Sequence, residues 1–338
     1  MSLKRLPAEW EPQDAVWLAW PANEELWPEN RPRVKNRFAA LIKTLSNYVQ
    51  VHVICPATSQ HEIERLLFNG CALLANIHFF HFETNDVWCR DFGPLFTVDD
   101  KGLVISDWEF NGWGGQYNSE KDNTVSTAIA TERAIPLTTT NAILEGGAID
   151  VNGHGQLLTT KAVLLNQNRN PQLSMESYEE LFLQHFGVTQ TIWLDAGLVN
   201  DDTDGHIDNI ARFVKNGSIL IASCEPDNIN YKNLQNNKRI LEITLIEGKA
   251  PTLIELPLPD PIFFNGQPLT ASYLNFISIN ELILVPSFEQ PRNDQQAQKI
   301  LQACFPSHQV NLFNCLDFIQ EGGALHCLSM NQPKTSGL

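Results

Sequence analysis

One short motif occurs twice in the chain: Glu-Gly-Gly-Ala followed by an aliphatic residue, first at Glu145–Ile149 and again at Glu321–Leu325. A motif duplicated within one chain indicates internal repetition, which decides the architecture more directly than the pattern of any single segment. Each copy follows a segment with the composition of a β-strand, so the two copies mark equivalent junctions between repeated units. The division of the chain into units begins from these two junctions.

The same order of elements recurs five times around these junctions: an apolar strand, a polar loop, an amphipathic helix and a second apolar strand. Alternating and β-branched residues indicate the strands, and apolar spacing such as Ile63, Leu66 and Leu67 indicates the helices. The leading strands are expected to begin near residues 49, 103, 157, 218 and 281, and the helices to cover residues 61–68, 123–133, 175–186, 231–242 and 295–305. Units this small cannot bury both faces of their strands alone, so they must pack on one another.

The two ends of the sequence indicate how the units close. A strand over Ala15–Trp20 and a helix over Arg31–Tyr48 precede the first unit, and a strand over Gly323–Met330 follows the last. The first and last strands would complete one unit from opposite ends of the chain. We therefore expect an α/β fold in which repeated ββαβ-type units form a ring, with residues 1–338 as a single catalytic domain. A plain open α/β sheet is the alternative.

The composition argues against several classes of protein. Hydrophobic residues make up 43% of the 338 residues, enough for a large core, and 39 acidic against 23 basic residues give a formal net charge of −16. Such a chain would repel nucleic acid and attract small cations, although an acidic surface also serves solubility alone. The longest apolar stretches have the length of strands, so no membrane span is expected, and the polar N-terminal sequence does not resemble a signal peptide.

The seven cysteines are scattered, and no two of them form a Cys-x-x-Cys pair. This pattern argues against a disulfide framework and against a thiolate zinc site. Reduced thiols, and with them a cytoplasmic location, are therefore expected. Most of the cysteines would be small core residues, and one could be a nucleophile.

Polar side chains stand at four of the five junctions between units. They are Asp91 in the first, Glu145 in the second, His206 and Asp208 in the third, and Cys327 in the last, whereas the fourth junction, residues 263–272, has no acid, histidine or cysteine. Equivalent positions in a closed ring lie at the same radius and depth. If the ring closes, these five side chains converge near its axis.

One thiol, one imidazole and three carboxylates form a set suited to covalent catalysis. The thiolate is the attacking form of cysteine, and a bound cation or a protonated histidine would stabilise it. His206 and Asp208 are two positions apart, so on a strand they would face the same way. The carboxylate could then hold a planar cation through forked hydrogen bonds while the imidazole reaches the reacting atom. Glu145 could fix the orientation of His206.

Structural roles are the alternative for several of these residues. Cys327 could be an ordinary buried core cysteine, and Glu145 and Glu321 could bond to the neighbouring Gly-Gly backbone, which is the favoured interpretation for Glu321. His326 precedes Cys327 and would face away from it on a strand, so a packing role is expected.

A metal site is a further alternative at the third junction. His206 with Asp202, Asp204 and Asp208 offers the oxygen-rich set that suits hard cations. The motif has no second histidine at ligand spacing, so no metal is predicted.

Several of these motifs, in order, resemble the agmatine deiminase family, within the larger guanidine-modifying (pentein) superfamily that includes bacterial peptidyl-arginine deiminases. The resemblance covers nearly the whole chain, and its motifs are Trp88–Pro94, Asp107–Gly115, Leu144–Gly147 with Asn168–Pro171, Thr203–Asn209 and Gly322–Cys327. The family is a five-bladed α/β propeller with its active site on the pseudo-fivefold axis. That architecture agrees with the five units counted above.

The resemblance implies a role for each residue of the expected central set. Cys327 would be the nucleophile and His206 the general acid and base. Asp91 and Asp208 would hold the guanidinium nitrogens, and Glu145 would support the histidine. The chemistry would run through a thiouronium adduct and would need neither a metal nor an organic cofactor.

For agmatine the resemblance implies N-carbamoylputrescine and ammonia as products, which belong to polyamine metabolism and putrescine biosynthesis. Asp202 matches the acidic residue that receives the distal ammonium, and Asp204 could share that role. Trp88 and Trp113 are core or wall residues, and if they line the site their faces would favour a cation.

Other activities stay open at this stage. The last motif has Gly323-Ala324 where the family usually has Gly-Asn, which leaves deimination of free arginine or peptidyl-arginine and amidino transfer as alternatives. Free arginine would need a basic partner for its carboxylate, and Arg90 alone stands out in the motif loops. A non-enzymatic pentein binding module would lack the thiol and the imidazole. The expected partner is a small cationic guanidino compound, with no nucleic acid and no membrane; whether the chain forms a homodimer stays open.

Overall fold

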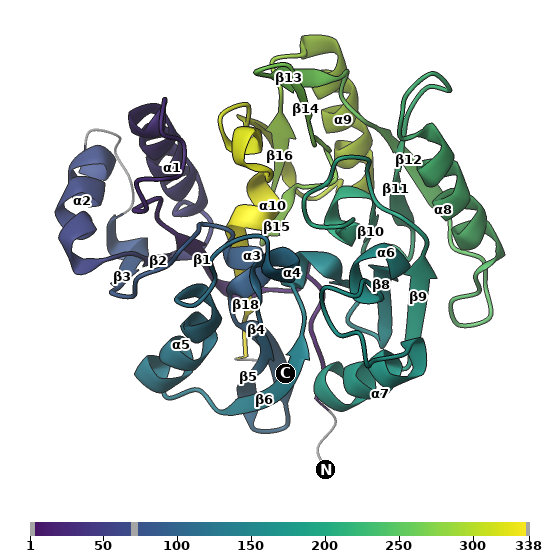
Figure 1. The fold of residues 1–338 in the computed structure, drawn as a ribbon, viewed down its shortest axis with the longest axis horizontal. Coiled ribbons are helices and arrows are strands. Elements are labelled where there is room, and N and C mark those ends of the chain that lie inside the picture. The colour runs from purple at the N-terminus through teal and green to yellow at the C-terminus, as the bar shows by residue number, and fades with distance from the viewer. Residues whose placement is uncertain (1–3, 69–73, 336–338) are drawn as a thin grey trace.

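The computed structural model describes residues 4–68 and 74–335. The β-sheets lie around a central region and the longer helices lie on the outside, while three short helices, α3 (Cys89–Phe92), α4 (Gly112–Gly115) and α10 (Leu325–Leu328), lie near the centre (Figure 1). The fold is therefore mixed α/β, as the sequence predicts.

Four of the six sheets in the described part of the chain share one topology, and a fifth resembles them. One strand pairs antiparallel with the strand that follows it, and this strand pairs in parallel with a third strand beyond a helix. The three-stranded sheets are β4 (Leu95–Asp99), β5 (Gly102–Glu109) and β6 (Leu137–Ile143); β7 (Asp150–Val151), β8 (Gln156–Thr160) and β9 (Gln190–Leu194); β10 (Ala211–Phe213), β11 (Ile219–Ser223) and β12 (Leu253–Pro257); and β15 (Ile277–Ile279), β16 (Leu282–Ser287) and β17 (Gln309–Asn314).

The fifth sheet joins the two ends of the described chain. Strand β18 (Ser329–Pro333) pairs antiparallel with β1 (Gln13–Ala19), and β1 pairs in parallel with β2 (Gln50–Ile54), which continues to β3 (Ile77–Phe80). The first unit is therefore completed by strands from both ends, as the sequence predicts. The indole Nε1 of Trp17 donates to the side-chain oxygen of Gln332 at 3.0 Å, which adds a buried polar contact across this pairing.

The helices follow from local sequence signals. They are α1 (Arg31–Leu45), α2 (Gln60–Phe68), α5 (Val125–Arg133), α6 (Lys161–Leu164), α7 (Met175–Phe186), α8 (Tyr231–Ile243) and α9 (Pro291–Cys304). Helix α7 begins where the Ser174 hydroxyl accepts from the Ser177 amide and ends at Gly187, whose φ of 68° suits glycine. The expected helices 61–68, 175–186 and 231–242 therefore agree closely with the structure. No helix of residues 4–68 and 74–335 is long and apolar enough to cross a membrane.

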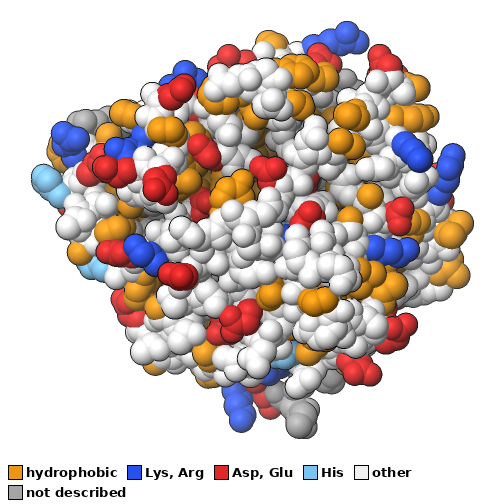
Figure 2. Space-filling model, viewed as in Figure 1, with side chains coloured by type: hydrophobic (Ala, Val, Ile, Leu, Met, Phe, Trp, Pro, Cys, Tyr) orange, Lys and Arg blue, Asp and Glu red, His pale blue; other side chains and the backbone are white. Residues whose placement is uncertain are grey.

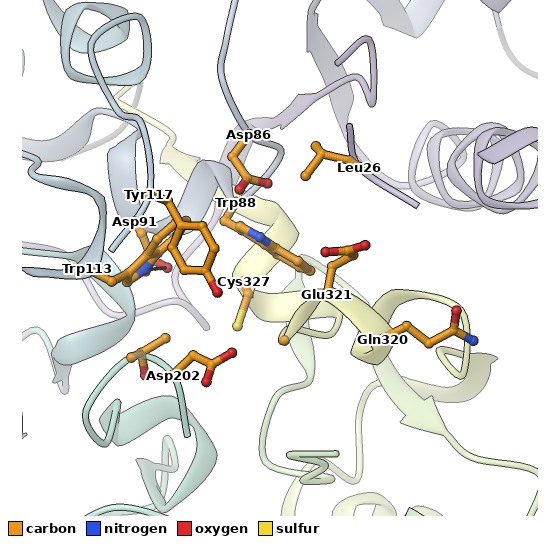
Figure 3. A pocket seen from close by; sticks show the side chains of 12 residues that line it. Leu26, Asp86, Trp88, Asp91, Trp113, Tyr117, Asp202, Gln320, Glu321 and Cys327 are labelled. Carbon is orange, nitrogen blue, oxygen red and sulfur yellow. Dashed lines mark hydrogen bonds between the residues drawn. The ribbon is translucent and has the colours of Figure 1, made fainter. Parts of the chain in front are cut away.

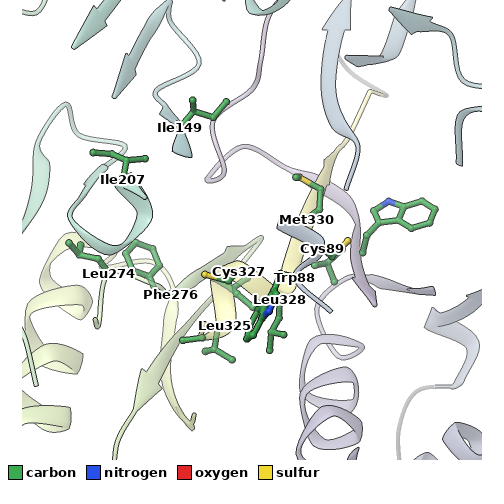
Figure 4. Close-up of a cluster of buried hydrophobic side chains, with 14 of the residues drawn as sticks. Trp88, Cys89, Ile149, Ile207, Leu274, Phe276, Leu325, Cys327, Leu328 and Met330 are labelled. Carbon is green, nitrogen blue, oxygen red and sulfur yellow. The ribbon is translucent and has the colours of Figure 1, made fainter. Parts of the chain in front are cut away.

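Buried side chains from the junctions between sheets meet in one cluster (Figure 4). The residues labelled there are Trp88, Cys89, Ile149, Ile207, Leu274, Phe276, Leu325, Cys327, Leu328 and Met330. Because each junction contributes to this cluster, the junctions that lie far apart in sequence are held together by hydrophobic burial.

The structure corrects one prediction near the end of the described chain and adds one element. Residues 325–328 form helix α10 and the strand begins only at Ser329, so the strand expected over Gly323–Met330 is wrong in its first half. Ala324 and Leu325 therefore start a helical turn instead of an extended segment. The additional element is a hairpin, β13 (Ile262–Phe264) with β14 (Gln267–Leu269), inside the fourth junction.

The contact between Trp17 and Gln332 offers a test of the closing sheet. Gln332→Leu should lower the free energy of unfolding by about 1–3 kcal/mol, because the buried indole N–H loses its acceptor. Gln267→Leu, at an exposed position of β14, should change it by less than about 0.5 kcal/mol. Urea denaturation of the two variants measures the difference, and equal effects would contradict this assignment.

Candidate active site

A cavity of about 170 Å³ opens at the centre of the molecule. Figure 3 shows its lining, which consists of Leu26, Asp86, Trp88, Asp91, Trp113, Tyr117, Asp202, Thr203, Gln320, Glu321, Gly322 and Cys327. Acidic side chains surround a hollow near the middle of this face in Figure 2, and basic side chains lie mostly toward the edges. None of the described residues that line the cavity is a lysine or an arginine. The cavity therefore suits a small cation.

The structure brings together the five residues that sequence analysis placed near the axis. Asp91 and Cys327 lie in the short helices α3 and α10, Glu145 precedes the turn Gly146–Ala148, and His206 and Asp208 lie at the turn Ile207–Asn209. All five are buried. Asp91 Oδ1 lies 3.7 Å from His206 Nδ1, and Cys327 Sγ lies 3.6 Å from Asp208 Oδ2.

The local geometry at the third junction differs from the prediction. His206 and Asp208 do not lie on a strand, because residues 207–209 form a 3₁₀ turn and His206 is the residue before it. The glycine of the second junction explains how closely these groups approach: a Cβ on Gly147 would lie 2.5 Å from His206 Nδ1 and 2.7 Å from Asp91 Oδ1. The Gly147 amide instead donates to Asp91 Oδ1 at 2.9 Å. Only glycine fits at position 147, because a Cβ atom there would clash with His206 and Asp91.

Burial keeps the thiol of Cys327 neutral while the cavity holds no cation. Burial raises its pKa well above the ordinary value, and the carboxylates of Asp208 and Asp91 raise it further. The Asn275 amide donates to Sγ at 3.1 Å and opposes these effects. A cation placed between the two carboxylates would cancel their charges and lower the pKa of the thiol.

Asn275 is a residue of the site that sequence analysis missed. Its side-chain oxygen also accepts from the backbone amides of His326 at 3.0 Å and Cys327 at 3.3 Å, which fixes the start of α10. Asn275 belongs to the fourth junction, which we drew as ending at Ser272. Extending that junction by three residues would have placed an amide in register with the other polar groups.

His206 is fully buried, and neither of its ring nitrogens has a hydrogen-bond partner among the described residues. Burial by itself lowers the pKa of His206, but the carboxylates of Asp91, Glu145 and Asp208 outweigh it, so the pKa lies above its ordinary value. A buried imidazole without partners is costly unless a ligand or water bonds to it. His206 lies behind the residues that line the cavity, next to Asp91, which does line it, so this feature points to a polar group of a ligand that reaches past the lining.

Asp91 faces the same place from the other side. Its Oδ2 accepts from the indole Nε1 of Trp113 at 3.0 Å, and burial raises the pKa of Asp91 to about 6, although His206 opposes the rise. Trp113 has a left-handed backbone with φ of 53°, which is unfavourable for a side chain of this size. The strained loop thus holds the indole that orients Asp91.

Glu145 and Asp204 are joined by Arg169, whose role sequence analysis did not assign although its motif was noted. Arg169 Nε lies 2.6 Å from Glu145 Oε1, and its Nη1 lies 2.6 Å from Asp204 Oδ2. Asp204 is therefore paired in the wall and is not among the cavity-lining residues, whereas Asp202 is. This placement does not support the expectation that Asp204 shares the binding of a distal ammonium.

Three carboxylates lie toward the mouth of the cavity: Asp86, Asp202 and Glu321. Burial raises the pKa of Asp86 to about 7, and the neighbouring carboxylates, Glu321 among them, contribute to the rise. Glu321 accepts from the Trp27 amide at 3.1 Å, so it bonds to backbone as expected, although not to the Gly-Gly pair, and it also faces the cavity. Trp88 lies between Asp86 and Cys327 in Figure 3, whereas Asp202 lies on the opposite side of Cys327.

No group of three or more His, Cys, Asp or Glu side chains in residues 4–68 and 74–335 is arranged to hold a metal ion. The six cysteines within these residues are free thiols, and Cys71 lies outside them.

Comparisons with known proteins agree on one family. Residues 5–333 match the family model described as Porphyromonas-type peptidyl-arginine deiminase. The chain is 35% identical to an agmatine deiminase of Pseudomonas aeruginosa, strain LESB58, over 97% of this chain and 95% of that protein.

Solved structures give the same result. An agmatine deiminase of C. jejuni, solved as a cysteine-to-serine variant with substrate bound, superposes with a TM-score of 0.90 at 33% identity, covering 98% of this chain and 97% of that one. The agmatine deiminase of Enterococcus faecalis gives a TM-score of 0.91 at 28% identity, with 98% and 96% covered.

The buried arginine should be essential for stability. Arg169→Met should lower the free energy of unfolding by about 3–5 kcal/mol, because it leaves the buried Glu145 carboxylate without its cation. Arg31→Met removes an exposed pair with Glu24 and should cost less than about 1 kcal/mol. Urea denaturation compares the two, and a similar small loss in both would show that Arg169 does not compensate a buried charge.

Proposed function

The chain belongs to the Porphyromonas-type peptidyl-arginine deiminase family, and on that premise we propose that it is an agmatine deiminase, which hydrolyses agmatine to N-carbamoylputrescine and ammonia. The observation that carries the proposal is the thiol of Cys327, which lines the cavity together with Asp91 and lies beside the buried carboxylate of Asp208 just behind the lining. A guanidinium ion is planar and cationic, so it would satisfy both carboxylates and present its carbon to the sulfur.

The first half of the reaction would form the covalent adduct. Binding of the guanidinium between Asp91 and Asp208 cancels the charges that raise the pKa of Cys327, so the thiol releases its proton to water in the cavity. The thiolate then bonds to the guanidinium carbon and gives a tetrahedral adduct. Protonated His206 donates its proton to one amino group, the C–N bond breaks, and ammonia leaves a thiouronium on Cys327.

The second half would use the now neutral His206 as a base. It accepts a proton from water, and the resulting hydroxide adds to the thiouronium carbon. The C–S bond then breaks with the electron pair returning to Cys327 Sγ, and loss of the hydroxyl proton leaves the ureido product. Arg169 holds one oxygen of Glu145, and the other oxygen has no partner among the described residues. That oxygen is available to stabilise the imidazolium form of His206.

The distal ammonium of agmatine would lie at the mouth of the cavity. Asp202 is the acid that we assign to it, with Glu321 as a second carboxylate on the same lining. Trp88 and Trp113 would flank the path between the two ends of the substrate, where aromatic faces favour a cationic chain.

Deimination of arginine or of peptidyl-arginine is the second candidate, because the family model carries that description. The absence of lysine and arginine from the described lining argues against a substrate carboxylate. Arg90 is committed elsewhere, since it pairs with Glu9 at 2.8 Å.

We also propose that the five similar sheets are the blades of a closed five-bladed α/β propeller that forms a single catalytic domain. The support is the shared strand order and the pairing of β18 with β1. The cytoplasmic location remains a prediction from the sequence, and whether the chain forms a homodimer stays open.

Assays of ammonia and of the ureido product with agmatine, arginine and a blocked arginine peptide test the activity. Agmatine should be the preferred substrate, and Cys327→Ser and His206→Asn should each lower kcat by at least about 100-fold. Product formation from none of the three substrates would refute the proposal, and a requirement for an amine acceptor would identify an amidinotransferase instead.

The fall of kcat/KM at acid pH should follow the protonation of Asp91. This carboxylate must be ionised to hold the guanidinium, and its raised pKa means that protonation begins near neutral pH, so kcat/KM should fall as the pH drops below about 6. The bound cation stabilises the ionised form, so the corresponding limb of kcat should lie at lower pH. Identical limbs in both parameters would contradict the assignment.

The distal site can be tested with a truncated substrate. Asp202→Asn should raise KM for agmatine about 10-fold with little change in kcat, because a charged hydrogen bond to the substrate is lost. The same variant should treat butylguanidine, which lacks the ammonium, as the wild type does. Glu225→Gln, an exposed acid in another loop, is the charge-matched control. An equal loss with both substrates would remove Asp202 from the distal site.

A further inference from the structure

A second group of buried charges lies beside the nucleophile and is not part of the cavity. It consists of His326, Glu9, Arg90, Arg212 and Asp150. Glu9 and Arg90 line a separate cavity of about 40 Å³ that shares no lining residue with the larger one. The charged group around Glu9 therefore lies outside the lining of the larger cavity, on the side of Cys327 away from it.

His326 connects this group to the site. Its Nδ1 lies 2.7 Å from Asp208 Oδ2 and its Nε2 lies 2.6 Å from Glu9 Oε1, and the side chain is almost fully buried. An ionised carboxylate only accepts hydrogen bonds, so both ring nitrogens must donate in this arrangement. The packing role expected for His326 from the sequence is therefore wrong, because α10 turns the imidazole toward Asp208 instead of extending it as a strand would.

Glu9 is held in place by two arginines. Its carboxylate lies 2.8 Å from Arg90 Nη1 and 2.6 Å from Arg212 Nη2. Arg212 is in turn paired with Asp150 at 2.8 Å, and Arg90 Nε donates to the backbone oxygen of His326 at 3.3 Å. Burial opposes ionisation of Glu9, but the two arginines and His326 outweigh it and hold its pKa well below the ordinary value. The segment before β1 thus carries a fixed negative charge into the centre.

The two oxygens of Asp208 have different surroundings. Oδ2 accepts from His326 and from the Asn275 amide, at 2.7 and 3.1 Å, whereas Oδ1 is buried and has no partner among the described residues. A carboxylate held on one side in this way cannot rotate without losing both bonds. The free oxygen is the one left for a ligand.

We propose that His326, fixed by Glu9, is a positioning residue that turns Asp208 so that Oδ1 meets the substrate guanidinium. The segment before β1 is thereby a working part of the active site. This inference rests on the proposed deiminase function.

The charges around Asp208 set the sign of the expected pH effect. Burial raises its pKa, but His326, His206 and Arg212 outweigh burial, so the pKa lies below its ordinary value. The remaining charged or titratable neighbours, Asp91, Asp201 and Cys327, do not favour the carboxylate. Loss of the His326 bond therefore makes Asp208 easier to protonate. Because protonation of Asp91 already sets the acid limb of kcat/KM near pH 6, protonation of a second carboxylate should make that limb steeper.

Two isosteric variants separate the two bonds of His326. The amide nitrogen of Asn can occupy the place of Nδ1, and that of Gln the place of Nε2. His326→Asn should keep the bond to Asp208 and retain kcat/KM for agmatine within about 10-fold, whereas His326→Gln should lose it and fall about 100-fold, since misplacement of a contact group by about 1 Å has that effect. The fall of kcat/KM at acid pH should be steeper in the Gln variant than in the wild type.

Glu9→Gln and Glu11→Gln form the matched pair for the segment before β1. Both remove one charge from the same segment, but Glu11 pairs with Arg5 and does not belong to the group around His326. Glu9→Gln should lower kcat/KM and steepen its acid limb, and Glu11→Gln should leave kcat/KM within about 2-fold of the wild type with an unchanged acid limb. Thermal unfolding shows whether the His326 variants fold. If they do not, the comparison of Glu9→Gln with Glu11→Gln tests the positioning role of His326 by itself.

The wild type separates failure of this inference from failure of the proposed function. If the wild-type protein releases no ammonia from agmatine, the proposed function is wrong. The binding of a guanidinium by Asp208 can then still be measured, because bound agmatine should protect Cys327 from alkylation by iodoacetamide. Weaker protection in His326→Gln than in His326→Asn supports the inference in either case. Equal losses in those two variants with an acid limb of unchanged slope, or equal behaviour of Glu9→Gln and Glu11→Gln, would overturn it.

Discussion

The centre of this protein depends on the compensation of buried carboxylates. An ionised carboxylate in a dry interior costs several kcal/mol unless cations or hydrogen-bond donors surround it. Each acid here takes its partners from other units of the fold: Glu145 from Arg169, Asp208 from His326 and Asn275, and Glu9 from Arg90 and Arg212. The polar network therefore ties the units to one another. Buried polar atoms without partners occur in several places in the described part of the chain, and those on His206, Asp208 and Glu145 belong to residues grouped beside the cavity. A guanidinium ion has the charge and the planar donors that such a site lacks.

The repeat in the sequence predicted most of the fold and the membership of the site. The expected starts of the leading strands lie within one residue of β2, β5, β8, β11 and β16, because alternation and β-branched composition are local signals. Grouping Asp91, Glu145, His206, Asp208 and Cys327 required only that the junctions be equivalent, and the structure places these five together. No knowledge of side-chain rotamers was needed for that step.

What the sequence did not predict depends on local turns and on pairing between units. The turn at residues 207–209 and helix α10 are one-turn elements, too short to leave a periodic signal, and they decide which way His326 points. Asn275 was missed because we considered only acids, thiols and imidazoles at the junctions, and its side chain is an amide. The sequence alone does not distinguish Asp204 from an acid that binds a ligand. Only the position of Arg169 in the structure shows that the carboxylate of Asp204 is already paired.

The pairing of β1 with β18 has a kinetic consequence. The two strands come from opposite ends of the described chain, so their contact carries a large loop-closure entropy and is expected late in folding. Helix α10, which carries Cys327, leads directly into β18. A partly folded chain would therefore hold the sulfur of Cys327 away from the acids and the imidazole, and reactivity toward cations would arise only in molecules in which β18 has paired with β1.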